Sequence, residues 1–217
     1  MPDIWMITGG GRSGKSAYAE SLATGAVTTG QEMPESLATG ADASGPKSLA
    51  AGQNTRAAPG VLYIATAAAC DDEMEERIAK HRAVRPGNWT TWERHRELSD
   101  IGQEFSRKGF GTILLDCVGN LLMGILFDEI PDADACTLAQ FESVEQLSIA
   151  EIDTLCAYAQ GHKTRLIFVT NEVGMGIIPE TRYARCYRDA LGRINKHIAE
   201  KADRVVLMVA GIPMTLK

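Results

Sequence analysis

The 217-residue sequence lacks the features that mark nucleic-acid-binding, membrane and secreted proteins. Its formal net charge is −6 and it has no dense Lys/Arg run, although phosphate neutralisation supplies most of the affinity for nucleic acid. No stretch approaches the roughly 20 apolar residues that a membrane-spanning helix needs. The first apolar run is short and leads into glycines, unlike a secretory signal. We therefore expect a cytoplasmic protein with no nucleic-acid partner and no membrane span.

Cysteine is scarce and scattered, which excludes the usual zinc and disulfide patterns. The five cysteines show neither a Cys-x-x-Cys pair nor metal-ligand spacing, and they are Cys70, Cys117, Cys136, Cys156 and Cys186. Such residues are typical of reduced, mostly buried thiols in the cytoplasm. The Asn-Lys-x-Asp motif with which GTPase switches read guanine is also missing, since Asn195-Lys196 is followed by His and Ile.

Short apolar runs alternate with stretches of helical spacing along most of the chain. The expected strands are Ile4–Thr8, Val61–Thr66, Thr112–Asp116, Arg165–Thr170 and Arg204–Ala210. The expected helices are Lys15–Gly25, Asp71–Val84, Leu98–Lys108, Leu121–Glu129, Leu138–Gln160 and Tyr183–Lys201. Buried strands joined by helices form parallel sheets through right-handed crossovers. The sequence therefore predicts one α/β domain over residues 1–217, with a doubly wound, mostly parallel sheet covered on both faces.

One segment, Val27–Ala58, departs from this alternation. It is rich in Gly, Ala, Ser, Thr and Pro and has no apolar periodicity. It also repeats related pentapeptides at Ser36–Gly40 and Ser48–Gly52, which resemble Ser21–Gly25. Long structureless loops are either functional or disordered. This composition favours a low-complexity, disordered surface insertion over a functional lid, because loop-closure entropy grows only slowly with length.

The most informative local motif is Gly9-Gly10-Gly11-Arg12-Ser13-Gly14-Lys15-Ser16, which matches GxxxxGK[ST]. In a phosphate loop, glycines let backbone N–H groups turn toward phosphate oxygens, the lysine reaches the β- and γ-phosphates, and the serine ligates Mg²⁺. The helix that follows adds the positive end of its dipole. Because a strand precedes the motif and a helix follows, we predict a nucleoside-triphosphate site rather than a chance glycine-rich turn.

A second Mg²⁺ ligand is expected at the end of a strand that neighbours the phosphate-loop strand. The segment Thr112–Asp116 is apolar and ends in a carboxylate, as a Walker B strand does. The alternative is a strand-terminal Asp that only caps the next helix. The predicted metal ligands are thus Ser16 and Asp116.

The predicted helix Asp71–Val84 has carboxylates in its first turns and cations in its last, as the helix dipole favours. His81 lies four residues after Arg77 and shares its face. On composition alone, the favoured interpretation is a solvated charged face with an incidental histidine. In the other interpretation, the neutral imidazole of His81 attacks an α-phosphorus and forms a histidine–nucleotide intermediate.

Together these motifs resemble the adenosylcobinamide kinase/adenosylcobinamide-phosphate guanylyltransferase family of cobalamin biosynthesis. The segment from Asn171 to Gly176, Asn-Glu-Val-Gly-Met-Gly, is far more specific than any phosphate loop. The matching segments are Ile7–Ser16, Leu62–Thr66, Asp71–Met74, Arg77, His81–Arg82, Arg85–Pro86, Trp89, Thr91–Glu93, Leu114–Cys117, Val169–Glu180, Arg188–Asp189, Gly192, Asn195 and Val209–Ile212. They span nearly the whole chain outside Val27–Ala58 and Ile130–Ser143.

The resemblance implies a RecA-like P-loop NTPase fold and two activities that use ATP or GTP with Mg²⁺. The family phosphorylates the aminopropanol hydroxyl of adenosylcobinamide, then transfers GMP from GTP onto that phosphate and releases pyrophosphate. Its catalytic residues here would be Lys15 and a guanylylated His81. The resemblance therefore favours the nucleophile interpretation of His81 over the solvated charged face that composition alone favours. The residues implied around the nucleotide are Gly9–Ser16, Thr66, Arg82, Glu93 and Asp116. The partners would be adenosylcobinamide, its phosphate, and two further copies of this chain in a homotrimer.

Several alternatives stay open. Asn171 and Glu172 either face the ligand crevice at the end of a strand, or belong to a turn that needs Gly174 and Gly176 for backbone freedom. Gly119 and Gly124 stand where the family has polar residues, which raises the question of local helix order. The rival functions are a plain P-loop kinase with an inert histidine and a nucleotide-responsive regulatory module.

Overall fold

The computed structural model describes residues 3–25, 60–67, 76, 79, 82–83, 85–105, 109–130 and 136–217. The Val27–Ala58 insertion and His81 therefore lie outside the described residues. Of the predicted helix Asp71–Val84, only residues 76, 79, 82 and 83 are described, and all four are helical. Within the described ranges, no helix is long and apolar enough to cross a membrane.

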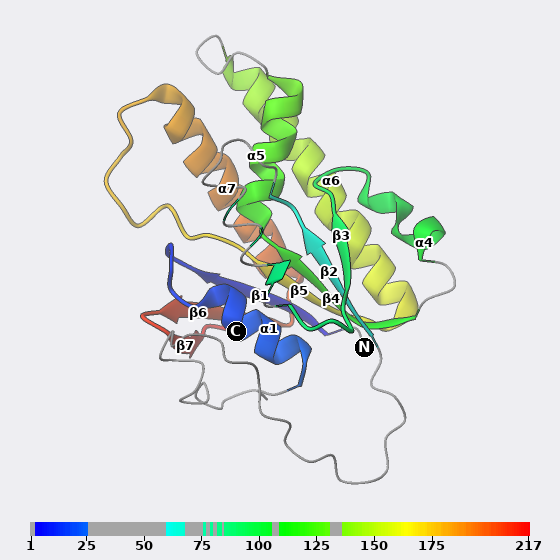
Figure 1. Cartoon of the computed structure of the whole chain (residues 1–217). Helices are drawn as coiled ribbons and strands as arrows, with labels where there is room; N and C mark the ends of the chain where they lie inside the picture. Colours follow the sequence, from blue (N-terminus) through cyan, green and yellow to red (C-terminus); the bar gives the residue numbers. More distant parts are fainter. Residues whose placement is uncertain are drawn as a thin grey trace, which may run out of the picture.

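A seven-stranded sheet forms the centre of the described structure (Figure 1). Its strands are β1 (Ile4–Gly9), β2 (Gly60–Ala65), β3 (Thr90–Glu93), β4 (Phe110–Asp116), β5 (Arg165–Val169), β6 (Arg204–Val209) and β7 (Ile212–Thr215). They lie in the order β3-β2-β4-β5-β1-β6-β7, and every pair is parallel except β6–β7. The predicted mostly parallel α/β sheet is confirmed. The edge strands β3 and β7 were not predicted, because they are short, mostly exposed and without a continuous apolar run.

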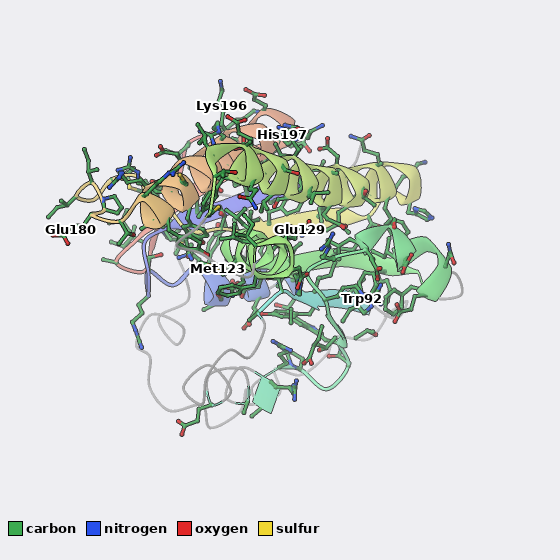
Figure 2. The ribbon with its side chains drawn as sticks, turned by 90° about the horizontal axis from the view of Figure 1, so that it is seen from above. Trp92, Met123, Glu129, Glu180, Lys196 and His197 are labelled. Atoms are coloured by element: carbon green, nitrogen blue, oxygen red, sulfur yellow. The ribbon has the colours of Figure 1, made fainter. Side chains whose placement is uncertain are left out.

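Among the helices whose bounds the structure describes, three long ones cover one face of the sheet and α1 covers the other (Figure 1). The described helices are α1 (Lys15–Ala23), α4 (Ile101–Glu104), α5 (Val118–Glu129), α6 (Leu138–His162) and α7 (Arg182–Lys201). Figure 2 shows α5, α6 and α7 side by side above the sheet, with Lys196 and His197 on the outer side of α7.

The helix predicted over Leu98–Lys108 is shorter than expected. A 3₁₀ turn, η1 (Leu98–Asp100), leads into the four-residue helix α4, and residues 106–108 are not described. Leu98, Ile101 and Phe105 are buried in the core, so the apolar spacing was interpreted correctly. Gly102 lies in the middle of the segment, and glycine costs about 1 kcal/mol relative to alanine in a helix interior. The three apolar side chains are thus buried although the regular helix spans only Ile101–Glu104.

The two faces of the sheet are buried in two hydrophobic clusters. Met6 packs with residues of α5, α6 and α7, whereas the neighbouring Ile7 packs with Tyr18 and Leu22 of α1. This alternation follows from the two-residue period of a strand. All six residues of β1 are buried, as expected for a parallel strand covered on both faces. The doubly wound arrangement is therefore confirmed.

The helix α5 runs without a break through both glycines that depart from the family pattern. A Cβ atom on Gly124 would lie 2.6 Å from Cγ of His95, and one on Gly119 would lie 2.9 Å from the hydroxyl of Tyr187. The Tyr187 hydroxyl donates to the Gly119 carbonyl at 3.2 Å. The glycines therefore let two large side chains lie against the α5 backbone, and the helix stays regular.

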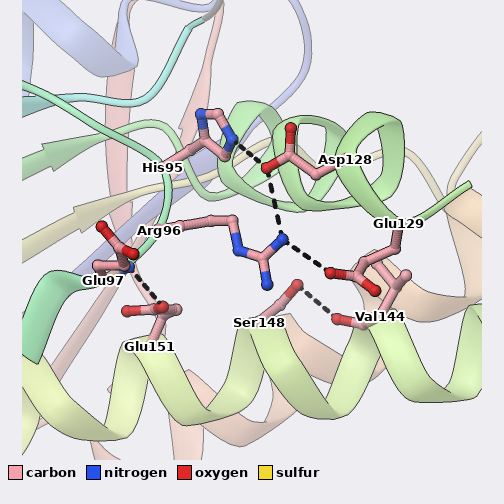
Figure 3. A network of polar contacts seen from close by, with 8 residues as sticks. All are labelled: His95, Arg96, Glu97, Asp128, Glu129, Val144, Ser148 and Glu151. Atoms are coloured by element: carbon pink, nitrogen blue, oxygen red, sulfur yellow. Dashed lines mark hydrogen bonds and ion pairs between the residues drawn. The ribbon is translucent and has the colours of Figure 1, made fainter. Parts of the chain in front are cut away.

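The segment after β3 is fastened to α5 and α6 by polar contacts (Figure 3). Nε2 of His95 lies 2.8 Å from Oδ2 of Asp128, and Arg96 donates to Glu129 at 2.7 Å. The Glu151 carboxylate accepts hydrogen bonds at 2.8 Å from the backbone N–H groups of residues 97 and 98. These contacts hold the end of β3 in place beside the rest of the sheet.

Replacing Gly124 by Ala should destabilise the protein by about 1–3 kcal/mol, because the methyl group would overlap the His95 ring. The matched control is Gly192→Ala in α7, where a Cβ would meet nothing within 4 Å. That change should raise the unfolding free energy by up to about 1 kcal/mol through helix propensity. Urea unfolding of the three proteins checks both signs. Equal stability of Gly124→Ala and wild type would show that His95 moves away at no cost.

Candidate active site

The predicted site residues that the structure describes gather at the carboxyl edge of the parallel strands. Gly9–Ser16 begins at the end of β1, Thr66 follows β2, and Glu93 and Asp116 end β3 and β4. Arg82 reaches the same edge by an ion pair with Glu93. Open α/β sheets bind ligands outside the carboxyl ends of their strands. The structure thus brings these dispersed residues to one side of the sheet.

Strand order sets the spacing among these residues. The strand β5 lies between β1 and β4, so the expectation that Asp116 ends a direct neighbour of the phosphate-loop strand is wrong. Sequence order does not dictate sheet order, and β5 returns to the position between the two strands. Neighbouring strands lie about 4.8 Å apart, which places the end of β4 about 10 Å from the end of β1. By the same measure, the end of β3 lies about 19 Å from the end of β1.

The backbone of the phosphate loop favours glycine at two positions. Gly9 has φ 147° and Gly14 has φ 92°, and a Cβ on Gly9 would lie 2.4 Å from the Met208 carbonyl oxygen. The loop is also anchored from outside. The Gly9 carbonyl accepts from the N–H of Glu172 at 2.9 Å, and the Ser13 carbonyl accepts from the N–H of Gly211 at 3.1 Å. The loop is therefore held in shape by the segments that follow β5 and β6.

Lys15 lies folded over this loop. Its side chain is buried, and Nζ donates to the Gly10 carbonyl at 2.5 Å. Burial lowers the pKa of Lys15, while the nearby Cys117 and Asp116 act in the opposite direction. The hydroxyl of Ser13 is buried without a hydrogen-bond partner. A buried orphan hydroxyl calls for an explanation, and a phosphate oxygen within the loop would satisfy it.

Asp116 is held by contacts from β2. The hydroxyl of Tyr63 donates to its Oδ2 at 3.0 Å, and the N–H of Thr66 donates to its carbonyl at 3.3 Å. The buried hydroxyl of Thr66 donates to the Cys117 carbonyl at 2.7 Å. Asp116 does not cap the helix that follows it. The N-cap position of α5 is Cys117, and no side-chain capping hydrogen bond is present there. Thr66 braces the end of β4.

The sequence did not predict a half-buried cluster of ionisable residues beside α1. The Arg85 guanidinium carbon lies 3.9 Å from the centroid of the Tyr63 ring, and the Trp89 ring stacks on Tyr63 with centroids 6.0 Å apart. Burial, with a contribution from Asp116, raises the pKa of Glu20 to about 7, while Arg85 opposes the shift. Burial and Asp116 also raise the pKa of Tyr63. No signal in the sequence pointed to this cluster, because Glu20 is not among the buried residues of α1 and its partners lie far away in the chain.

The segment after β5 is tied to the phosphate loop and to α7. The Glu172 carboxylate accepts from the N–H of Gly174 at 2.6 Å, which supports the turn interpretation. Neither Gly174 nor Gly176 has a positive φ, so the predicted need for backbone freedom is wrong. Asn195 of α7 accepts from the Thr170 hydroxyl at 2.6 Å, and its amide donates to the Asn171 carbonyl at 3.0 Å.

Comparison with known proteins gives consistent matches. A family model described as cobinamide kinase / cobinamide phosphate guanyltransferase matches residues 36–216. The bifunctional adenosylcobalamin biosynthesis protein CobU of Escherichia coli (strain K12) is 36% identical over 212 residues, which is 98% of each chain. The protein of the same name from Salmonella typhimurium is 35% identical, again over 98% of each chain.

The bifunctional adenosylcobalamin biosynthesis protein CobP of Pseudomonas aeruginosa is 35% identical over 98% of this chain and 96% of its own. The family model begins after the phosphate loop. The alignments with the relatives leave only 2% of this chain uncovered, so the phosphate loop falls within them.

The Gly9→Ala variant should lose about 1–3 kcal/mol of stability, because the methyl group meets the Met208 carbonyl and the backbone has φ 147°. Gly10→Ala is the matched control for stability, since a Cβ there meets nothing within 4 Å. Urea unfolding of the nucleotide-free proteins measures both. Equal destabilisation by the two changes would contradict the close approach of Gly9 to β6.

The folded-state pKa of Glu20, about 7, lies above its ordinary value of 4.5. Its contribution to stability is therefore full below pH 4.5 and is lost as the pH rises through about 7. Between these pH values the loss is on the order of 3 kcal/mol, which Glu20→Gln should remove. Urea unfolding across this pH range checks it, with the exposed Glu104→Gln as control. A wild-type profile parallel to that of Glu20→Gln would refute the shift.

Proposed function

Because this chain belongs to the cobinamide kinase / cobinamide phosphate guanyltransferase family, we propose that it phosphorylates adenosylcobinamide and then guanylylates the product. The chain is an enzyme of adenosylcobalamin biosynthesis with the predicted α/β P-loop fold. One observation carries the proposal: similarity to bifunctional relatives runs through nearly the whole chain, the phosphate loop included.

In the proposed kinase step, the aminopropanol hydroxyl of adenosylcobinamide attacks the γ-phosphorus of ATP or GTP. A new O–P bond forms, the bond between the γ-phosphorus and the bridging oxygen breaks, and the hydroxyl proton is lost. Lys15 would move its ammonium group from the Gly10 carbonyl to the phosphate oxygens. Fixed positive charge and backbone N–H groups stabilise the charge that develops on the leaving phosphate.

In the proposed transfer step, His81 attacks the α-phosphorus of GTP. An N–P bond forms and pyrophosphate leaves, so the histidine carries GMP. An oxygen of adenosylcobinamide phosphate then attacks the same phosphorus, the N–P bond breaks, and adenosylcobinamide-GDP is released. Arg82, the next residue in the chain, is exposed and paired with Glu93. This pair is suited to orienting the nucleotide.

We propose that Ser16 and Asp116 hold Mg²⁺. Hydroxyl and carboxylate oxygens are hard ligands that suit this ion, and its remaining positions go to phosphates and water. The donor set fits, because Tyr63 occupies only Oδ2 of Asp116 and no described residue hydrogen-bonds to Oδ1. Bound Mg²⁺ would neutralise charge on the triphosphate.

We further propose a homotrimer with shared active sites, working in the cytoplasm. The chain exposes a run of apolar residues between β5 and α7, in which Met175 is 80% exposed and Ile177 is 96% exposed. Exposed contiguous apolar surface marks interaction sites, and closed rings are the usual way in which identical chains associate. Cytoplasmic location is supported by the cysteines of the described segments, all of which are free.

The covalent step is tested with GTP radiolabelled at the α-phosphate, Mg²⁺, and denaturation before counting. Wild type should retain acid-labile, alkali-stable label, and His81→Ala should retain none. His162→Ala is the matched control, because His162 is an exposed residue that stacks on Tyr158. It should label as wild type does.

The two rival functions give different results in the same assay. Transfer of γ-label to a corrinoid without α-labelling of the protein would leave a plain kinase with an inert histidine. Nucleotide binding with no transfer of either label would leave a regulatory module. Adding adenosylcobinamide phosphate to labelled wild type should release the label as adenosylcobinamide-GDP.

The trimer is tested with Ile177→Asp, which places a charge at the most exposed of the large apolar side chains described. Burying an unpaired charge is costly, so the variant should dissociate at concentrations where wild type is trimeric. Sedimentation velocity measures the mass of each species. Leu138→Asp, which alters another exposed apolar side chain, serves as control. A monomeric wild type, or an unaltered Ile177→Asp trimer, would contradict this interface.

A further inference from the structure

The orientation of Asp116 depends on one side-chain hydrogen bond. The Tyr63 hydroxyl donates to Oδ2 at 3.0 Å, and the described residues make no hydrogen bond to Oδ1. The backbone contact from Thr66 goes to the carbonyl of Asp116 and leaves its carboxylate free to rotate. Tyr63 is therefore the group that decides which carboxylate oxygen faces outward.

The register between β2 and β4 makes this contact possible. Ala65 lies directly opposite Asp116, and Tyr63 lies opposite Leu114. Side chains two residues apart share a face of the sheet, so Tyr63 and Asp116 are diagonal neighbours on one face. The small side chain of Ala65 leaves the space open, and a tyrosine is long enough to reach across the diagonal.

The tyrosine ring is itself fixed in place. Tyr63 is 3% exposed, with the Arg85 guanidinium over its ring at 3.9 Å and the Trp89 ring stacked on it. Cation–π and stacking contacts of this kind restrict the ring. The hydroxyl therefore points to Asp116 in a structure that is already organised before any ligand arrives.

We propose that Tyr63 is a positioning residue for the divalent cation: by holding Oδ2 of Asp116, it reserves Oδ1 for the metal. The inference rests on the proposed function, which assigns Asp116 to Mg²⁺. Partners that orient a metal ligand typically change metal affinity by 10–100-fold when they are removed. Tyr63→Phe keeps the ring and its stacking contacts and deletes only the hydroxyl.

The test measures binding of the α,β-methylene analogue of GTP by titration calorimetry, with Mg²⁺ and with EDTA. This analogue is suitable because attack by His81 cannot cleave its α–β linkage. In wild type, Mg²⁺ should strengthen binding. In Tyr63→Phe, the Mg²⁺ concentration needed for half of this effect should rise about tenfold, whereas affinity in EDTA should not change.

Tyr187→Phe is the matched control, since it deletes a phenol hydroxyl that donates to a backbone carbonyl of α5. It should leave the Mg²⁺ dependence at the wild-type value. A double-mutant cycle with Asp116→Asn separates positioning from general loosening. If Tyr63 acts through Asp116, Tyr63→Phe should have no further effect on Mg²⁺ dependence in the Asp116→Asn background.

The outcomes distinguish this inference from the proposed function. If Mg²⁺ strengthens binding equally in wild type and in Tyr63→Phe, the role of Tyr63 is overturned and the proposed function still stands. Wild type without any Mg²⁺ effect would overturn both the assignment of Asp116 and the inference. An equal loss of affinity with EDTA and with Mg²⁺ in Tyr63→Phe would show a structural role only, and would also overturn the inference.

Discussion

The phosphate loop depends on the hydrogen bonding of β1 to a parallel strand on each side, β5 and β6. This double ladder fixes the point where the strand ends, and Gly9 then turns against the carbonyl of Met208. Because backbone groups buried in a sheet must be paired, the loop cannot shift along the strand without breaking both ladders. The position of Lys15, and of the proposed triphosphate site, follows from this constraint.

Several interacting ionisable groups lie on the α1 side of the sheet, where Lys15 and Tyr63 are buried and Glu20, Arg85 and Asp116 are half-buried. Burial lowers the pKa of Lys15 and raises those of Glu20 and Tyr63, and Asp116 acts on all three. Charge interactions are stronger in such surroundings than in water. A triphosphate entering the loop would therefore meet groups that already interact electrostatically. Tyr63 lies between two of them, because its hydroxyl donates to Asp116 and its ring contacts Arg85.

The two proposed half-reactions make different use of the carboxyl edge. The phosphate loop and Asp116 lie two strands apart, whereas the Arg82–Glu93 pair lies at the edge strand β3, four strands from β1. His81 precedes this pair in the sequence. The proposed homotrimer is one way in which such distant groups could act at a common site. The exposed apolar segment around Ile177 gives such an assembly a surface on which to form.

The sequence by itself determined the features that depend on neighbouring residues, namely the phosphate-loop motif and the buried strands. The GxxxxGK[ST] motif placed Gly9–Ser16 between a strand and a helix, and apolar runs located the five inner strands, because burial on both faces demands them. Sequence could not supply the order of those strands, so β5 between β1 and β4 was missed, as were the exposed edges β3 and β7. It also could not bring Tyr63, Arg85 and Glu20 beside Asp116. These residues interact across up to 96 positions of sequence, from Glu20 to Asp116, and only the register and packing of distant segments decide such interactions.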